Sequence, residues 1–253
     1  MKKIAALLLL LLLIISCTSK DDSPNTDDQQ MDDPQDNPIQ NPFRLVQVIL
    51  TNIGGDVLID DIDYNQQNQV INETFSIDDV EQYSGTYFYD EDRLVRANVS
   101  TGSEYNYFYT DDVVTSSNRI HPSFQQDFTY TYDNNANLVR TDRFSGGTLD
   151  CVTNYEYDEN GNSTTHNSSC GSALISRTYN TRLNPRKLLF KDNYDKALFI
   201  SNNGLISYSY QTDNVEWDYD YSYTYNEDDL VSVKITSENG KIIRTEEYIY
   251  EDL

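Results

Sequence analysis

Aromatic side chains are the residues of this sequence best suited to chemistry at a surface. The segment Asp218–Tyr225 alternates polar and aromatic residues, and the single tryptophan, Trp217, precedes it. Because successive side chains of a β-strand point to opposite faces, the rings of this segment should share one face. Such rings can stack on sugars, and the predicted ligand platform comprises Trp217, Tyr219, Tyr221 and Tyr223. The simpler interpretation is that these rings, with the tyrosine ladders at 105–109, 130–132 and 208–210, form the buried core.

Acidic side chains are a second candidate group, because Ca²⁺ prefers clustered carboxylate oxygens. Two clusters fit this description, namely Asp60-Asp61-Asp63 and Asp218 with Asp220. The turn Asp158-x-Asn160-Gly-Asn162 is similar to a calcium loop, but it lacks the glycine at the sixth position and the distal glutamate. Turn formation explains that segment better. We therefore expect no cofactor, with Ca²⁺ as the one metal that these acids would suit.

No arrangement of residues predicts catalysis. The two histidines, His121 and His166, lie 45 residues apart with no cysteine or glutamate at ligand spacing, so zinc is not expected. The sequence has no serine-centred elbow, phosphate loop or metalloprotease helix. No pair of carboxylates stands out for glycoside hydrolysis. The sequence predicts a protein that is not an enzyme.

Cys151 and Cys170 flank the polar turn that begins at Asp158. Two thiols outside the cytoplasm can pair. If Asp158 faces Ser163 across a four-residue loop, opposed residue numbers sum to 321 and the cysteines lie opposite each other, at a separation that a disulfide can bridge. A five-residue loop that pairs Tyr157 with Ser163 would place them on opposite faces unless a bulge intervenes. We predict a disulfide between Cys151 and Cys170.

The charge balance excludes several classes of partner. The formal net charge is -24, and removal of Lys2 and Lys3 with a signal segment leaves 16 basic against 42 acidic side chains, or -26. Nucleic-acid phosphates require a basic face, and so does docking of the fold on anionic lipid. We expect no nucleic-acid partner and a solvated acidic surface.

The N-terminus has the features of an export signal. Lys2 and Lys3 precede an apolar run of 12 residues, Ile4–Ile15, which is too short to span a bilayer as a helix. The segment Ile14-Ile-Ser-Cys17 resembles the lipobox of bacterial lipoproteins, and the following Thr18-Ser-Lys-Asp-Asp22 resembles the export signal of Bacteroidota surface lipoproteins. These resemblances imply acylation of Cys17, with chains such as palmitate, and a lipid-anchored outer-membrane protein that faces the cell exterior. The periplasmic face is the alternative.

Three regions follow from this pattern: a signal peptide at 1–16, a lipidated cysteine with an acidic disordered tether at 17–42, and a β-rich domain at 43–253. The tether has prolines at 24, 34, 38 and 42 and no apolar period. From Phe43 onward the chain alternates short strand patterns with polar turns, and no segment predicts a convincing helix. The 21 tyrosines and 9 phenylalanines exclude a disordered domain.

A short unit recurs along this domain, with tyrosine, any residue, tyrosine, and Asp or Asn before a turn. Its copies include 87–95, 130–139, 155–161, 223–231 and 248–251, and the second tyrosines recur about every 20 to 26 residues. The pattern resembles the YD, or RHS-type, repeat and the related repeats of Bacteroidota lipoproteins. The resemblance implies an all-β fold, an antiparallel meander of stacked β-hairpin repeats in an extended or curved sheet. The chain has too few repeats to enclose a cargo.

Three functions are compatible with these features. The first is a cell-surface binding or adhesion module for a glycan or a protein, held to the membrane through its N-terminal lipid alone. The second is a structural or assembly component of the outer envelope. The third, a glycan-active enzyme, has the least support from the sequence.

Overall fold

The computed structural model describes residues 42–158, 161–171, 174–189, 203–212 and 215–253. These residues form sixteen strands and one short 3₁₀ helix, η1 (Pro185–Leu188). The first eight strands are β1 (Phe43–Asn52), β2 (Val57–Tyr64), β3 (Val70–Ile77), β4 (Val80–Asp90), β5 (Arg93–Val99), β6 (Glu104–Thr110), β7 (Val113–His121) and β8 (Phe124–Tyr132). The second eight are β9 (Leu138–Ser145), β10 (Thr148–Tyr157), β11 (Ser163–Ser168), β12 (Leu174–Leu183), β13 (Asn203–Gln211), β14 (Glu216–Tyr225), β15 (Val231–Glu238) and β16 (Lys241–Asp252).

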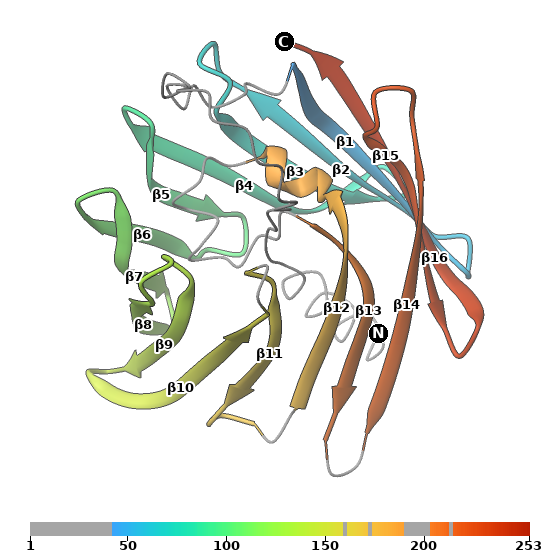
Figure 1. Ribbon diagram of the computed structural model, residues 1–253. Coiled ribbons are helices and arrows are strands. Elements are labelled where there is room, and N and C mark those ends of the chain that lie inside the picture. Colours follow the sequence, from blue (N-terminus) through green and yellow to red (C-terminus); the bar gives the residue numbers. More distant parts are fainter. Residues whose placement is uncertain (1–41, 159–160, 172–173, 190–202, 213–214) are drawn as a thin grey trace, which may run out of the picture.

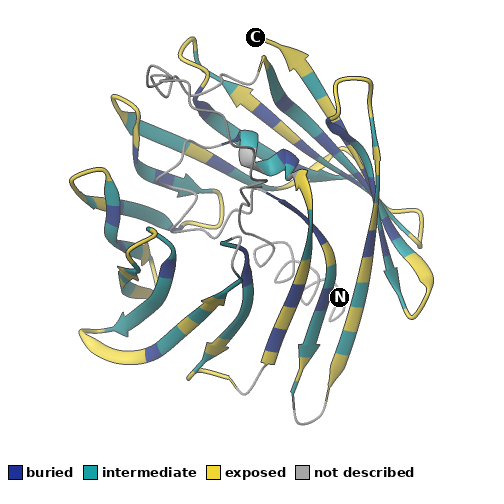
Figure 2. Cartoon of the chain, viewed as in Figure 1, coloured by how far each residue is buried: buried dark blue, intermediate teal, exposed yellow. Residues whose placement is uncertain are grey.

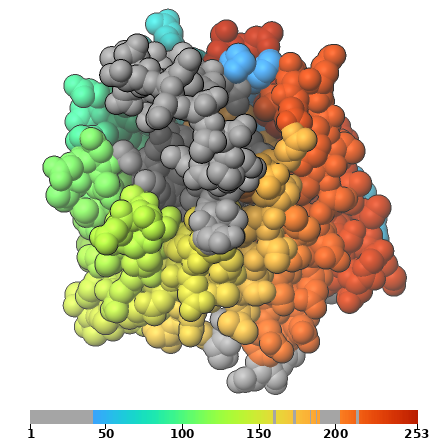
Figure 3. All heavy atoms as spheres, viewed as in Figure 1, coloured from blue at the N-terminus to red at the C-terminus, as the bar shows by residue number. Residues whose placement is uncertain are grey.

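The strands form one closed antiparallel barrel. Each strand pairs with its neighbours in sequence, and β1 pairs with β16 from Phe43↔Asp252 to Asn52↔Arg244, which closes the ring. Figure 1 shows this ring of strands, and in Figure 3 the last residues of the chain lie against the first described ones. The all-β prediction is correct, but an extended or curved repeat sheet is wrong. Pairing between β1 and β16 removes both edges that an open sheet would expose.

The hairpin turns at one end of the barrel form the side-chain to backbone hydrogen bonds expected of the recurring unit. The Asp133 Oδ1 atom accepts hydrogen bonds from the backbone N–H groups of Asn135 and Asn137, at 2.9 and 2.8 Å. Asn226 forms the same pair of bonds with the N–H groups of Asp228 and Leu230. Each side chain closes its turn locally, and a left-handed residue follows, such as Ala136 with φ 59°.

The tyrosines of the unit have a specific structural role. In seven cases the phenol hydroxyl donates to a backbone carbonyl at the start of the preceding strand, over 2.6 to 2.9 Å. The pairs are Tyr64 to Leu45, Tyr109 to Leu94, Tyr132 to Val114, Tyr157 to Leu138, Tyr179 to Ser163, Tyr223 to Leu205 and Tyr250 to Val231. We call this set the tyrosine–carbonyl ladder. Tyr132, Tyr157 and Tyr250 are the second tyrosines of their copies of the unit, and Tyr223 is the first tyrosine of its copy. In these copies the recurrence in the sequence corresponds to one hydrogen bond repeated around the barrel.

The ladder forms where regular strand pairing ends. Between β7 and β8 the pairing reaches Ser116↔Thr129, and Val114 and Tyr132 lie beyond it. The pairing of β8 with β9, the next strand, has a register shift between Thr131 and Tyr132. Such bulges increase local twist and bend a strand. The strand pair therefore separates at this end, and the tyrosine hydroxyl provides the buried carbonyl with its donor.

The two faces of the barrel wall differ in composition. Inward side chains are aromatic, aliphatic and, in one sector, charged. On β14 the tyrosines point inward while the outward residues Asp218, Asp220, Ser222 and Thr224 are exposed, as the alternating colours of Figure 2 illustrate. Outward residues on β8 and β12 are also exposed and include Thr129, Thr131, Ser176 and Thr178, while Leu174 is an apolar outward residue of β12. Within the described ranges, no helix is long and apolar enough to cross a membrane.

Removal of one ladder hydroxyl should destabilise the barrel. Tyr132→Phe leaves the carbonyl of Val114 without its donor, and a buried unsatisfied group costs about 1–3 kcal/mol. We expect urea denaturation to show a loss of this size. Tyr105→Phe is the matched control, because no ladder bond involves the hydroxyl of that partly buried tyrosine. Equal stability of Tyr132→Phe and the wild type would contradict the role of the ladder.

Candidate functional site

Helix η1 lies inside the barrel. It follows β12, yet Arg186 contacts β2 and β3, which are six or more strands away around the ring in either direction. Such a contact must cross the lumen, and Figure 1 shows η1 within the ring of strands. Asn184 starts the helix by accepting a hydrogen bond from the backbone N–H of Arg186, and Pro185 occupies its first turn. Leu189 then packs in the apolar cluster that also contains Leu45 and Val48.

Arg186 joins two carboxylates on the opposite wall. Its Nη2 atom lies 2.6 Å from Asp60 Oδ2, and its Nη1 atom lies 3.3 Å from Glu73 Oε1. The Asp60 side chain is only 4% exposed, whereas that of Arg186 is 30% exposed. Glu73 also accepts a hydrogen bond from the Tyr87 hydroxyl at 2.7 Å. These ion pairs hold η1 against β2 and β3.

A second group of charges lies on β15 and β16. Lys234 Nζ donates to both oxygens of Glu246, at 3.1 and 3.4 Å, and the Tyr248 hydroxyl donates to Glu246 Oε2 at 2.7 Å. Arg244 Nε lies 3.1 Å from Glu246 Oε1 but without the geometry of a hydrogen bond. All four residues are buried. Burial of charge is costly unless each group is paired, so this sector of the lumen is built around its ion pairs.

A cavity of about 60 Å³ separates the two groups of charges. Asp60, Arg186, Lys234, Arg244, Glu246 and Tyr248 line it, together with Asn184 and the apolar side chains of Val48, Leu50 and Phe75. We call this space the charged cavity. Two of its lining atoms, Asp60 Oδ1 and Arg244 Nε, are buried and have no hydrogen-bond partner among the residues that the structure describes.

The protein environment changes the ionisation of these groups. Burial, reinforced by the nearby Glu73 carboxylate, raises the pKa of Asp60 from 3.8 to about 7 despite the opposing effect of Arg186. Burial alone would also raise the pKa of Glu246, but Lys234 and Arg244 outweigh it and lower that pKa to about 2. Burial and the Glu246 carboxylate raise the pKa of Tyr248 well above its usual value. Near neutral pH, Glu246 is therefore ionised and Asp60 is the group close to its titration point.

The predicted aromatic platform lies on the inner wall, and its four members have two different environments. Tyr221 is buried, and the Tyr223 hydroxyl is bound to the Leu205 carbonyl, so both have structural roles. Trp217 and Tyr219 are half-buried and lie near the β13–β14 end of the barrel. Trp217 stacks on Tyr210 of β13 with ring centroids 5.0 Å apart. The half-buried rings Tyr210, Trp217 and Tyr219 form what we call the rim aromatics.

The acidic clusters considered for Ca²⁺ do not converge. Asp60 points into the lumen, whereas Asp61 and Asp63 are exposed on the outer wall. Asp218 and Asp220 are both outward and exposed. Asp158 closes its own turn, with Oδ1 accepting from the Asn162 N–H at 2.8 Å. Across the described residues, no group of three or more metal-ligating side chains is positioned to hold an ion.

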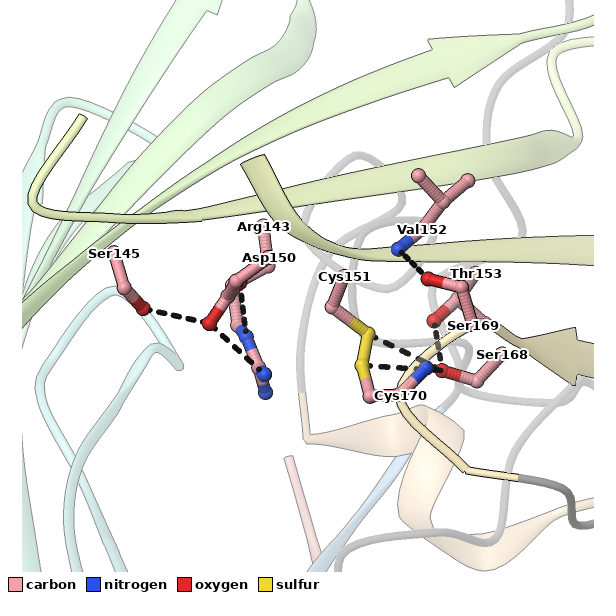
Figure 4. Close-up of a disulfide and its surroundings, with 9 residues drawn as sticks. All are labelled: Arg143, Ser145, Asp150, Cys151, Val152, Thr153, Ser168, Ser169 and Cys170. Atoms are coloured by element: carbon pink, nitrogen blue, oxygen red, sulfur yellow. Dashed lines mark hydrogen bonds and ion pairs between the residues drawn. A yellow bond between two sulfur atoms is a disulfide. The ribbon is translucent and has the colours of Figure 1, made fainter. Parts of the chain in front are cut away.

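Cys151 and Cys170 form a disulfide with Cα atoms 5.2 Å apart (Figure 4). The turn between β10 and β11 pairs Tyr157 with Ser163, and a bulge follows, so that Glu156 pairs with Thr165. From there the opposed residue numbers sum to 321, as in Thr153↔Ser168. The bulge thus returns both cysteines to one face, which is the condition that the five-residue loop required. Cys17 lies outside the described residues.

Sequence reasoning missed the charged cavity, although part of its signal was present. Arg244 and Glu246 share the alternation phase of the inward Tyr248 and Tyr250, and Asp60 shares the phase of the buried Leu58 and Ile62. Charged residues in an inward phase indicate a buried polar site. Arg186 has no such signal, because it lies in a connection between strands.

Comparisons with known proteins bear on the fold. No protein-family model and no curated protein matches the chain. Among solved structures, a porin-like protein from Bacteroides uniformis aligns with a TM-score of 0.60 and 12% identity, over 83% of this chain and 98% of that one. A porin-like protein from Bacteroides vulgatus aligns with a TM-score of 0.53 and 11% identity, over 83% and 100% of the two chains. At these identities the similarity defines the fold and no more.

These findings correct the family assignment. The structural neighbours are porin-like barrels, so the resemblance to YD or RHS-type repeat proteins is wrong. The tyrosine and aspartate spacing that suggested it arises from the tyrosine–carbonyl ladder and the hairpin turns, which a closed barrel also needs. The neighbours give no support to the lipoprotein description, and the N-terminal segment that suggested it lies outside the described residues.

The raised pKa of Asp60 predicts a specific dependence of stability on pH. The pKa of Asp60 is higher in the folded state than its ordinary value of 3.8, so the folded state binds the proton more tightly than the unfolded state. The stability that this proton contributes is complete below pH 4 and is lost as the pH rises to about 7. We expect the difference in free energy of unfolding, wild type minus Asp60→Asn, to fall between pH 4 and pH 7 in urea titrations. A difference that rises with pH would show that the Arg186 ion pair outweighs burial.

The disulfide should contribute to stability. It closes a loop of 19 residues, and restriction of the unfolded chain by a loop of this size is worth about 3 kcal/mol. We expect reductant to lower the urea midpoint of the wild type but not that of a variant with Cys151→Ser and Cys170→Ser. Peptide mapping without reductant should recover the two cysteines in one linked fragment. Recovery of both as free thiols would contradict the pairing.

Proposed function

We propose that this protein is an outer-membrane-associated binding module that takes up a glycan inside its barrel. The observation that carries this proposal is the placement of the rim aromatics: Trp217, Tyr219 and Tyr210 point into the lumen and are only partly buried. Sixteen strands enclose a lumen too wide for one layer of side chains to fill. An interior with exposed aromatic faces and nearby polar groups suits sugar rings, which stack on their apolar faces and hydrogen-bond at their edges.

The residues on the outer wall favour a binding protein over a pore embedded in a membrane. A lipid-facing barrel needs an outward apolar band about 25 Å tall, with charges on that face disfavoured. Here the outward residues of β14 include Asp218 and Asp220. Apolar outward side chains such as Phe108 and Ile249 occur singly among polar ones. The barrel wall is therefore better suited to water than to lipid.

An outer-membrane location fits the porin-like fold of the neighbours. The finer localisation rests on the sequence alone, which predicts attachment through Cys17 and a barrel outside the cell. Metabolic labelling with a fatty-acid analogue, followed by protease treatment of intact cells, tests both parts. Loss of label in Cys17→Ala and digestion of the barrel on intact cells are the expected results. An unlabelled wild type, or a barrel protected in intact cells, would contradict them.

Binding of glycans should depend on the rim aromatics. We expect the folded chain to bind glycans on an array, and we expect Trp217→Ala to weaken the binding about tenfold in titration calorimetry, since one aromatic contact is worth about 1 kcal/mol beyond its buried area. Phe108→Ala is the matched control, because it removes an aromatic ring from the outer wall. An array without a bound glycan, or equal losses in the two variants, would contradict the proposal.

A further inference from the structure

The charged cavity contains two charged side chains of opposite sign that each have one ion pair but leave an atom without a hydrogen bond to the described residues. Asp60 is 3% exposed, and its Oδ1 atom has no hydrogen-bond partner in the described part of the chain. Arg244 is 6% exposed, and its guanidinium has no hydrogen bond to the described residues; its one ion pair, with Glu246, has poor geometry. A buried charged group without a full set of partners costs several kcal/mol. A carboxylate oxygen and a guanidinium that both lack hydrogen bonds and line one cavity therefore indicate a binding site for a group that supplies them.

The other charges of the cavity are already satisfied. Arg186 bridges Asp60 Oδ2 and Glu73, while Lys234 and Tyr248 occupy the oxygens of Glu246. What is left for a ligand is one acceptor on β2 and one donor group on β16. These two residues form no ion pair with each other, although both line the same cavity.

The apolar lining of the charged cavity and its size further limit which ligands it can bind. Val48, Leu50 and Phe75 provide a hydrocarbon surface between the charged walls. The cavity volume of about 60 Å³ holds several water molecules or a small molecule. The cavity is lined by β1, β2, β3, β15, β16 and the start of η1, whereas the rim aromatics lie on β13 and β14. This site is therefore separate from the rim aromatics, and its existence does not depend on the proposed glycan binding.

We propose that the charged cavity binds a small zwitterion, with its ammonium group on Asp60 Oδ1 and its carboxylate on the Arg244 guanidinium. The carbon skeleton of the ligand lies against Val48, Leu50 and Phe75. A simple anion would leave Asp60 Oδ1 without a hydrogen-bond donor, and a simple cation would leave the Arg244 guanidinium without a well-oriented acceptor. One molecule with both charges satisfies the two together, and charge-assisted hydrogen bonds of this kind are the stronger ones.

Calorimetry and thermal unfolding of the full chain test this inference. The probes are glycine, β-alanine and γ-aminobutyrate, which separate the two charges by increasing distances. Acetate and methylammonium are the half-ligands. We expect at least one zwitterion to bind and to raise the midpoint of unfolding, since a ligand that binds the folded state alone stabilises it, and we expect both half-ligands to bind at least tenfold more weakly. Equal binding of acetate, or binding of no zwitterion to the folded wild type, would overturn the proposal.

Single substitutions in the charged cavity and on the outer wall test where the zwitterion binds. Asp60→Asn and Arg244→Gln should each weaken zwitterion binding at least tenfold. Arg244→Lys retains the positive charge and should bind the zwitterion more tightly than Arg244→Gln. If Arg244→Gln folds poorly, Arg244→Lys also serves as the folded variant at this position. The control pair is Arg140→Gln and Asp142→Asn, because that ion pair lies on the outer wall. Zwitterion binding that survives both cavity variants, or is lost in the control variants, would overturn the assignment. Trp217→Ala should leave zwitterion binding unchanged, which separates this site from the glycan site.

Discussion

The structure depends on a hydrogen bond between a tyrosine hydroxyl and a backbone carbonyl of the neighbouring strand. The bond recurs seven times around the barrel, at the end where strand pairs separate after a bulge. A flat sheet of this length would leave its two edges free, whereas bulged and twisted hairpins can curl until β1 meets β16. The curvature removes backbone partners from buried carbonyls, and the tyrosines replace them. Tyrosine suits this role because its ring fills the lumen wall while its hydroxyl reaches a polar group.

The same inward tyrosines determine what the lumen can hold. Their rings line a wide interior with partly polar surfaces, which lets charged residues on β2, β15 and β16 face inward without contacting lipid or bulk solvent. Helix η1 then enters the lumen, and Arg186 connects it to the far wall through Asp60 and Glu73. The protein therefore has an interior of two parts, a charged sector beside η1 and an aromatic sector that extends to the rim at Trp217. Each part suits a different ligand chemistry.

The local structure could be predicted from sequence, whereas the closure could not. The spacing of residues such as Tyr130, Tyr132 and Asp133 correctly indicates hairpins with side-chain-closed turns. The pairing of Phe43 with Asp252 leaves no local signal, because it depends on twist and bulges summed over sixteen strands. An open repeat sheet has the same local pattern, which is why the sequence favoured it. Lys234 and Glu246 could have been noticed from their inward phase, but Arg186 acquires its partners only through the closed topology.

Closure of the ring is the claim on which both binding sites rest, and cysteine cross-linking between the first and last strands measures it directly. Thr51 and Thr245 are opposed in the β1–β16 pairing and are both partly exposed. A chain with Thr51→Cys and Thr245→Cys should form an intramolecular disulfide under mild oxidation, whereas Thr51→Cys with Thr224→Cys, on the outer face of β14, should not. Peptide mapping that finds the Thr51–Thr245 pair uncross-linked in the folded monomer would show an open sheet and contradict the closed barrel.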